Sequence, residues 1–169
     1  MQTLSTRRLL LRPLTLEDLP AVHALASDPE VARYMRFPVS TSLAMTHRLV
    51  TEYLEAEARG DALPWTVAER ATGRTIGVFV LSQGDDGCPG HGISVYLAPS
   101  CWGKGYLSEL LPMISDFAFN QLQTFALTAH IVQDNTASCH VFLKNGFVLR
   151  DLFHYPDCDL GVYVKRPPV

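Results

Sequence analysis

The segment from Ser94 to Leu111, SVYLAPSCWGKGYLSELL, constrains the fold more than any other part of the sequence. An apolar, strand-like run ends at Pro99, Gly103 and Gly105 surround a lysine, and a helical pattern begins directly afterwards. Glycine permits close backbone approach, and a helix begins with free N–H groups and the positive end of its dipole. The segment therefore predicts a strand–loop–helix unit that binds an anion.

Two common nucleotide-binding motifs do not fit this loop. It lacks the G-x-x-x-x-G-K-[ST] spacing of a P-loop. After Gly103 and Gly105, Ser108 stands where a dinucleotide-binding loop has its third glycine. Nucleotide binding by either of these routes is therefore disfavoured.

Composition narrows the class of protein. The 169 residues, with 47% hydrophobic and 18% charged residues, predict a single globular domain over 1–169. A net charge of −3, with 14 scattered basic residues, argues against a nucleic-acid partner. Only Leu9–Leu11 follow the basic pair Arg7 and Arg8, which is too short for a signal peptide or a membrane span. We expect a cytoplasmic protein with no membrane partner.

The cysteines predict no metal site. The chain has four of them, and none stands in a C-x-x-C pair. In a reducing compartment we expect free thiols rather than disulfides. The four are Cys88, Cys101, Cys139 and Cys158.

Hydrophobic periodicity predicts an α/β (α+β) chain. Strands are expected over 8–14, 64–69, 75–82, 93–98, 125–132 and twice within 148–165, and helices over 15–28, 42–59, 106–118 and 135–146. The composition of residues 85–92, DDGCPGHG, predicts a loop. The expected architecture is a mixed, mostly antiparallel central sheet of about seven strands flanked by about four helices.

Three separated segments resemble the GNAT superfamily of acetyl-CoA-dependent N-acetyltransferases. They are STRRLLLRPLTLEDL, LAPSCWGKGYLSELL and DNTASCHVFLKNGF, in this order. The branch that they resemble is typified by the RimJ and RimL ribosomal-protein N-terminal acetyltransferases. The resemblance implies acetyl-CoA as co-substrate and an amine acceptor such as a protein N-terminus. It also implies a monomer or homodimer and a splay between the fourth and fifth strands.

The resemblance assigns the residues that bind coenzyme A. The pyrophosphate loop falls on Trp102, Gly103, Lys104, Gly105, Tyr106 and Leu107. Trp102 replaces the usual Gln or Arg of the family pattern, and Leu107 replaces a small residue. Exposed backbone at Tyr96 and Ala98 would pair with the pantetheine arm, an N–H near Leu97 would polarise the thioester, and Asn135 would contact coenzyme A.

Catalytic assignments follow the same resemblance. Ser138 is the candidate acid that protonates the departing thiolate. The glutamate that relatives often place three residues after the phenylalanine of the GF pair is Arg150 here. The candidate bases are the adjacent Asp151, which would point to the other face of a regular strand, and two histidines. These are His91, which precedes the thioester strand, and His154.

Two alternatives stay open at the level of sequence. Cys101 and Cys139 flank the proposed site, so a covalent acetyl-cysteine route competes with direct attack by the amine. The departures at Trp102, Leu107 and Arg150 are also compatible with an acyl-CoA-binding module that has no turnover. The main prediction is an N-acetyltransferase that transfers the acetyl group directly to a primary amine.

Overall fold

The computed structural model describes residues 1–35, 37–85 and 88–169. The chain forms two compact units, each built from two stretches of sequence. Unit 1 consists of Met1–Ser82 and Ser94–Lys104, and unit 2 consists of Gln83–Ile93 and Gly105–Val169. The expectation of one domain over 1–169 stays a prediction.

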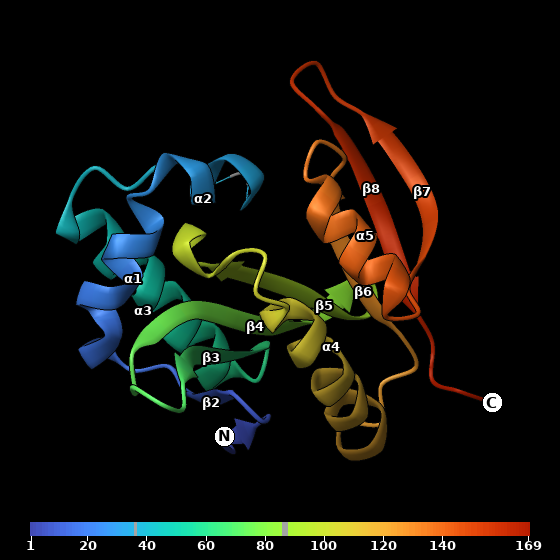
Figure 1. Ribbon diagram of the computed structural model, residues 1–169, viewed down its shortest axis with the longest axis horizontal. Helices are drawn as coiled ribbons and strands as arrows, with labels where there is room; N and C mark the ends of the chain where they lie inside the picture. The colour runs from blue at the N-terminus through green and yellow to red at the C-terminus, as the bar shows by residue number, and fades with distance from the viewer. Residues whose placement is uncertain (36, 86–87) are drawn as a thin grey trace. The chain divides into compact units, whose positions relative to one another are not determined.

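The strands form one sheet, in the order β1-β2-β3-β4-β5-β6-β8-β7 (Figure 1). They are β1 (Leu4–Ser5), β2 (Leu9–Pro13), β3 (Ala62–Glu69), β4 (Thr75–Asp85), β5 (Cys88–Leu97), β6 (Leu127–Val132), β7 (Val148–His154) and β8 (Asp159–Lys165). The β5–β6 pair is parallel, whereas β1–β2, β2–β3, β3–β4, β6–β8 and β7–β8 are antiparallel. The mixed, mostly antiparallel sheet is confirmed, and the short β1 is the strand beyond the seven expected.

In the described residues five α-helices accompany the sheet, and the one beyond the expected four is α2. They are α1 (Leu19–Ala26), α2 (Pro29–Met35), α3 (Leu43–Arg59), α4 (Tyr106–Asp116) and α5 (Thr136–Lys144). The boundaries of α3 follow from its caps: Ser42 Oγ accepts a hydrogen bond from Met45 N–H, and Gly60 ends the helix with φ 78°.

The predicted loop over 85–92 is wrong at both ends, because β4 continues to Asp85 and β5 begins at Cys88. Asp86 and Gly87 lie outside the described residues. The glycines of this stretch serve close packing: a Cβ atom at Gly84 would lie 1.8 Å from the Cys88 carbonyl oxygen. A Cβ atom at Gly90 would lie 2.0 Å from the Ala126 carbonyl oxygen. A composition typical of turns therefore reflects strands that approach too closely for side chains.

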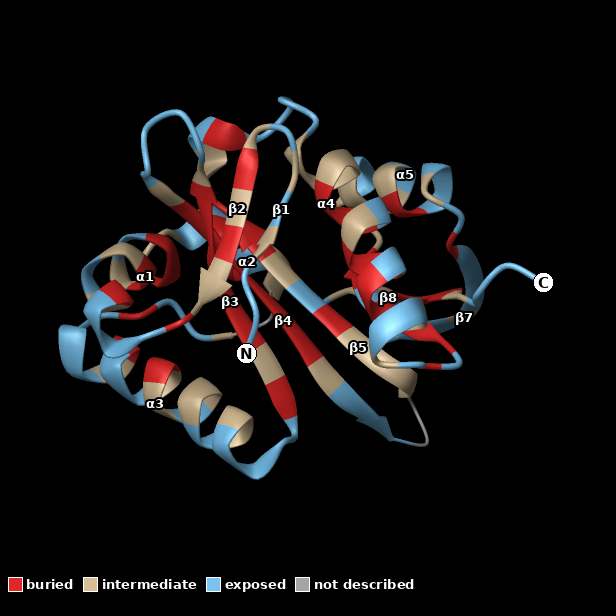
Figure 2. Ribbon diagram, turned by 90° about the horizontal axis from the view of Figure 1, so that it is seen from below, coloured by how far each residue is buried: buried red, intermediate tan, exposed pale blue. Residues whose placement is uncertain are grey.

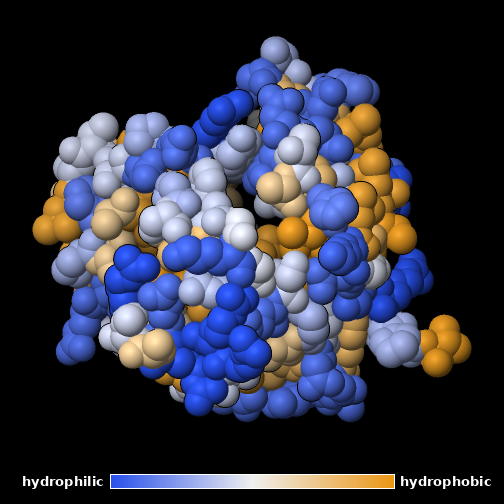
Figure 3. All heavy atoms as spheres, in the orientation of Figure 1, coloured by the Kyte–Doolittle hydropathy of each residue, from blue (hydrophilic) through white to orange (hydrophobic). Residues whose placement is uncertain are grey.

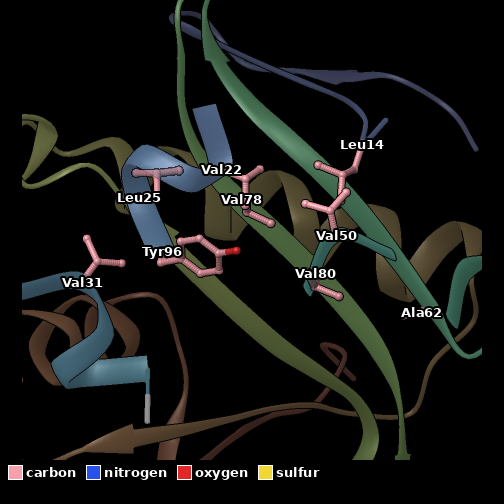
Figure 4. Packing of buried hydrophobic residues seen from close by; sticks show 9 residues of the cluster. All are labelled: Leu14, Val22, Leu25, Val31, Val50, Ala62, Val78, Val80 and Tyr96. Carbon is pink, nitrogen blue, oxygen red and sulfur yellow. The ribbon is translucent and has the colours of Figure 1, made fainter. Parts of the chain in front are cut away.

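The core of unit 1 lies between its strands and its helices (Figure 4). Side chains from α1, α2 and α3 meet those of β3, β4 and β5 in one apolar cluster. Its buried members are Leu14, Val22, Leu25, Val31, Val50, Ala62, Val78, Val80 and Tyr96. Because Tyr96 belongs to this cluster, the end of β5 is held by the unit 1 core.

A buried carboxylate fixes the start of the helical region in unit 1. Asp18, 5% exposed, accepts two hydrogen bonds from the Arg12 guanidinium, of 2.5 and 3.0 Å. The Thr15 N–H and the Thr66 hydroxyl each donate to it at 2.9 Å. Burial alone would raise the pKa of Asp18, but these hydrogen bonds outweigh burial and hold the pKa below its ordinary value.

In unit 2, helix α5 covers one face of the sheet formed by β6, β8 and β7. Cys139 of α5 interacts with the hydroxyl of Tyr163, which is buried in β8. Strand β7 is the edge strand and is mostly exposed (Figure 2). Strand β6, by contrast, is buried at five of its six residues. Large apolar side chains remain exposed on β7, and Figure 3 shows apolar residues gathered where Figure 1 draws this strand.

We expect Asp18→Asn to lower the free energy of unfolding by about 1–3 kcal/mol, because the buried amide cannot accept all the hydrogen bonds that the carboxylate accepts from Arg12 and Thr66. The control is Asp61→Asn, since the Arg59–Asp61 pair has side chains 60% and 54% exposed. That substitution should alter the free energy of unfolding by no more than about 0.5 kcal/mol. Urea unfolding at pH 7 measures both. Because the pKa of Asp18 is lowered, its contribution should fade only as the pH falls below its ordinary value of 3.8. Equal effects of the two substitutions would contradict this account.

Candidate functional site

The backbone of β5 directs alternate residues to opposite edges. His91 N–H donates to the Ala126 carbonyl, on the side of β6, at 3.0 Å. Ala98 N–H donates to the Ile76 carbonyl, on the side of β4, at 2.7 Å. Because backbone groups alternate along a strand, odd-numbered residues from His91 onward present their amides to the edge opposite β4.

This alternation corrects one expectation about the thioester strand. The amide of Ala98 is already bonded to β4, and a Cβ atom at Gly77 of β4 would lie 2.6 Å from the Tyr96 carbonyl oxygen. Tyr96 and Ala98 thus direct their backbone groups into the sheet of unit 1, and do not offer them to a pantetheine arm. The amides of Val95 and Leu97 point to the opposite edge.

The pairing of β5 with β6 stops before either strand ends. Among the residues that the structure describes, the paired positions run from His91↔Leu127 to Ile93↔Ala129. Strand β5 continues to Leu97 and β6 to Val132. The strand edge from Val95 to Leu97 therefore lies beyond the positions at which the parallel neighbour pairs.

The loop between β5 and α4 has the backbone of an anion cradle. Gly103 has φ 73° and Gly105 has φ 76°, a region that side chains rarely adopt. Gly105 is the N-cap residue of α4 and contributes no capping side chain. The first-turn N–H groups, such as those of Leu107 and Ser108, have no acceptor inside the helix. Such N–H groups at a dipole's positive end favour a bound anion.

Trp102 anchors this loop. Its indole Nε1–H donates to the Leu97 carbonyl at 2.9 Å, and its ring lies 6.4 Å from that of Tyr34. The ring itself remains 43% exposed. The tryptophan that replaces the family's Gln or Arg thus ties the loop to the end of β5.

Asn135 and Ser138 form the start of α5 in unit 2. The Asn135 side chain accepts a hydrogen bond from Ser138 N–H at 3.3 Å, so the N-cap role is confirmed. The Ser138 side chain is half-buried. The next residue is Cys139, and its Sγ lies 3.7 Å from Gln133 Nε2.

His91 lies in the part of β5 that pairs with β6. An extended strand advances about 3.3 Å per residue, so His91 lies about 20 Å along β5 from Leu97. Its Nδ1 lies 2.9 Å from the Thr124 hydroxyl, which itself donates to the Ala126 carbonyl. Nδ1 therefore carries the proton in this bond. The expectation of a catalytic His91 stays a prediction; in the structure its imidazole binds Thr124 beside the paired positions of β5 and β6.

Asp151 owes its orientation to a β-bulge. Leu149 is opposite Tyr163 in β8, and Asp151 is opposite Val162, so Arg150 is the extra residue. Asp151 therefore lies on the face of the sheet that residue 150 would occupy in a regular strand. The expectation that Asp151 points to the other face is wrong, since it assumed unbroken alternation. One Asp151 oxygen accepts a hydrogen bond from Arg150 Nε at 2.6 Å.

Sequence reasoning missed His130. Five of the six residues of β6 are buried, and the sixth, His130, is exposed. It follows Ala129, the last residue of β6 that pairs with β5. The one available signal was a titratable residue within the apolar run LTAHIV.

Unit 1 also contains a pocket of about 190 Å³ beside α3. Apolar side chains dominate its wall, with charged groups from one face of the helix, and they include Phe37, Pro38, Met45, Leu49, Arg48 and Glu52. Phe37 packs edge-on against Tyr96, with ring centroids 5.5 Å apart. The pocket thus adjoins the side chain of a thioester-strand residue.

The described part of the chain has neither a membrane-spanning helix nor a cluster of metal-ligating side chains. Over 1–35, 37–85 and 88–169, no helix is both long and apolar enough to cross a bilayer. In the same ranges, no group of three or more His, Cys, Asp and Glu side chains could hold a metal ion.

The chain is similar to known acetyltransferases over most of its length. Residues 8–148 match the family described as the acetyltransferase (GNAT) domain. An uncharacterised N-acetyltransferase, p20 of Bacillus licheniformis, is 30% identical over 156 residues, which cover 89% of this chain and 87% of the relative.

Two solved structures show the same fold. The ribosomal L7/L12 alpha-N-protein acetyltransferase RimL, in complex with coenzyme A, has a TM-score of 0.83 and 20% identity, with 98% of both chains covered. Spermidine N-acetyltransferase from Vibrio cholerae, in complex with coenzyme A and spermine, has a TM-score of 0.79 and 19% identity, with 94% of this chain and 95% of that chain covered. The expected fold is confirmed.

We expect His91→Gln to reduce the dependence of stability on pH. Burial lowers the pKa of His91, so the unfolded chain binds a proton more readily and stability falls as the pH drops below about 6.5. Urea unfolding at pH 5 and pH 7.5 measures the difference, which should be smaller in His91→Gln than in the natural chain. His47→Gln, on the exposed surface of α3, is the control and should keep the full difference. An unchanged difference in His91→Gln would contradict the burial argument.

Proposed function

This chain belongs to the GNAT acetyltransferase family, and from that premise we propose that it transfers the acetyl group of acetyl-CoA directly to a primary amine. The observation that carries the proposal is the glycine-capped start of α4 directly after a strand edge that β6 leaves unpaired. The strand edge would hold the thioester, and the helix start that follows it would hold the diphosphate. Two relatives of the same fold were solved with coenzyme A, which supports the choice of donor.

The loop supplies the diphosphate contacts. The N–H groups from Gly103 to Leu107 would donate to phosphate oxygens, and the helix dipole adds about 0.3–1 kcal/mol per favourable charge. A Cβ atom at Gly103 would meet nothing within 4 Å, so the outer side of the loop is open. Lys104 is exposed and adds a positive charge, while Tyr106 begins the helix. Asn135 completes the proposed contacts from the start of α5.

The strand edge supplies the thioester contacts. The pantetheine arm would pair with the odd-numbered edge of β5, at Val95 and Leu97, instead of with Tyr96 and Ala98. The Leu97 amide would donate to the thioester oxygen as negative charge develops there, an effect worth about 3 kcal/mol. In the transfer, the amine nitrogen bonds to the carbonyl carbon, the carbon–sulfur bond breaks, and Ser138 gives the departing thiolate a proton.

Direct attack fits the cysteines better than a covalent acetyl-cysteine. Cys101 is 1% exposed, with its Sγ facing Arg74 and Ser100. Cys139 Sγ contacts Gln133, and its helix covers the buried Tyr163. A nucleophilic cysteine needs access to the thioester carbon and a base beside it. Neither thiol has this arrangement.

The acceptor is a primary amine, and a protein N-terminus is our first choice. RimL acts on a ribosomal protein, and the Vibrio cholerae enzyme acts on spermidine, so relatives of this fold use both kinds of amine. The apolar pocket beside Tyr96 would receive the side chain next to an α-amine, with the Glu52 carboxylate at its wall to attract the cationic group. A polyamine offers no apolar side chain to fill such a pocket.

The test of function is release of the coenzyme A thiol in the presence of amines. We expect acetyl-CoA to bind in calorimetry, and peptides with a free N-terminus to release thiol faster than spermidine. The same peptides with an acetylated N-terminus are the control and should release none. Binding without release across the panel would identify an acyl-CoA-binding module without turnover, and absence of binding would contradict the proposal entirely.

We expect Gly105→Val to weaken acetyl-CoA binding at least tenfold, because a branched side chain would stand among the N–H groups that face the diphosphate. Gly60→Val is the matched control, since Gly60 has φ 78° against 76° at Gly105 and no neighbour within 4 Å of an added Cβ. Both changes strain the backbone by about 1–2 kcal/mol. Calorimetry with acetyl-CoA separates them: equal affinities in the two variants would show that the diphosphate binds elsewhere.

A further inference from the structure

We propose that Trp102 is a positioning residue of the transfer: its indole N–H holds the Leu97 carbonyl and thereby fixes where the thioester lies along β5. The inference rests on the function proposed above, in which the Leu97 N–H polarises the thioester. It is carried by the hydrogen bond between Trp102 Nε1 and the Leu97 carbonyl oxygen, and by the other contacts of the peptide group that this bond holds. All of these residues belong to unit 1.

The peptide group between Leu97 and Ala98 is hydrogen-bonded at both ends. Its carbonyl oxygen accepts from Trp102 Nε1 at 2.9 Å, and its N–H donates to the Ile76 carbonyl at 2.7 Å. The C=O and N–H of a trans peptide group point in opposite directions, and the group itself is planar and rigid. The orientation of this plane is therefore set by β4 on one side and by Trp102 on the other.

The carbonyl that Trp102 holds lies next to the proposed oxyanion donor. The N–H and C=O of one strand residue point to the same edge of the strand, so both groups of Leu97 face the edge opposite β4. They belong to successive peptide groups that meet at the Leu97 Cα. Fixing the second peptide group therefore limits the motion of the first, whose N–H would face the thioester oxygen.

Trp102 also decides which groups of this edge a ligand can use. An extended arm pairs with a strand edge through N–H and C=O groups, which Val95 and Leu97 direct to this side. Because the indole donates to the Leu97 carbonyl, the arm finds its acceptor at Val95, and Leu97 contributes its N–H. A slip by one pair of residues would move the arm by about 6.6 Å along the strand. The thioester oxygen would then lie out of reach of the Leu97 N–H.

The indole is itself held in one direction. The backbone N–H of Trp102 donates to the Pro99 carbonyl at 3.1 Å, at the end of the short 3₁₀ turn Pro99–Cys101. The Trp102 ring lies 6.4 Å from the Tyr34 ring, and the two planes are inclined by 53°. An anchored backbone and a packed ring together aim the Nε1–H, as a group that positions another must be aimed. Because Trp102 is 43% exposed, replacing its indole with a smaller ring leaves no buried cavity.

A second interpretation gives Trp102 only the task of shaping the diphosphate loop, since Gly103 follows it directly. The two roles affect different steps. A loop anchor acts on the binding of coenzyme A, whereas a group that aims the Leu97 N–H acts chiefly in the transition state, where negative charge develops on the thioester oxygen. The bond favours the second role, because it reaches the end of β5 and not the amides that face the diphosphate.

The test is Trp102→Phe, which keeps an aromatic ring and removes the indole N–H. We expect kcat for the N-terminal peptide to fall by about tenfold or more, while the affinities for coenzyme A and acetyl-CoA change by less than about threefold. Trp65→Phe is the matched control, because the Trp65 indole N–H donates to the Gln2 carbonyl, also at 2.9 Å and also in unit 1. This variant should lower the thermal unfolding temperature and leave kcat unchanged, since Trp65 is buried in the core.

Infrared spectroscopy of bound acetyl-CoA, isotopically labelled at the thioester carbonyl, reads the proposed contact without turnover. A hydrogen bond to a carbonyl oxygen weakens the C=O bond and lowers its stretching frequency. We expect the band to lie at lower frequency in the complexes of the natural chain and of Trp65→Phe than in that of Trp102→Phe. A purely structural role of Trp102 would leave the band in place.

The outcomes separate this inference from the proposed function. Natural kcat and an unmoved band in Trp102→Phe would overturn the positioning role while the acetyltransferase activity stands. A loss of coenzyme A affinity that accounts for the whole loss of kcat/KM, with the band unmoved, would also overturn it, since a loop anchor predicts that result. Absence of thiol release from the natural chain with any amine would overturn the proposed function, and the band would still decide whether Trp102 aims the Leu97 N–H.

Discussion

The account depends on how β5 divides its two edges between neighbours. Its even-numbered residues bond to β4, as the Ala98 N–H does to Ile76, while its odd-numbered residues face β6. Pairing with β6 ends at Ile93, yet the strand continues to Leu97 with the same alternation. Strand edges that lack a partner present N–H and C=O groups ready to bond. In this protein such groups are proposed to hold a substrate.

The chain that follows this edge prepares a second set of amides. Trp102 ties the loop back to the Leu97 carbonyl, and two glycines with positive φ turn the backbone into α4. Because Gly105 lacks a side chain, the first turn keeps its N–H groups for an outside acceptor. One continuous segment thereby carries contacts for a thioester and a diphosphate. The proposed acid, Ser138, begins α5 in unit 2.

Much of this could be read from the sequence, because the relevant signals are local. Caps at Ser42 and Gly60, the capping role of Asn135 and the glycines around Lys104 are each decided within a few residues. The alternation of backbone N–H groups along a strand is also local. Which residues direct these groups to which edge, however, depends on the hydrogen bonds to the neighbouring strand. The sequence placed exposed backbone at Tyr96 and Ala98, whereas the bond to Ile76 shifts it to the odd-numbered residues.

The remaining errors share a cause in long-range pairing. The bulge at Arg150 exists only in relation to β8, so no pattern within β7 shows that Asp151 changes face. The glycines of residues 84–92 predict a loop from sequence alone. The structure shows instead that the Cys88 and Ala126 carbonyls lie too close to Gly84 and Gly90 for a side chain. His130 is the one titratable residue of the run LTAHIV, and its exposure within the buried strand β6 is apparent only in the structure.

The central claim is that the N–H groups at the start of α4 bind the diphosphate of acetyl-CoA. Hydrogen exchange at the Leu107 and Ser108 amides, followed by NMR with and without acetyl-CoA, tests it most directly. We predict fast exchange in the free protein and clear protection in the complex, with the capped first turn of α3 unchanged. Equal exchange rates at Leu107 and Ser108 under saturating acetyl-CoA would contradict the account.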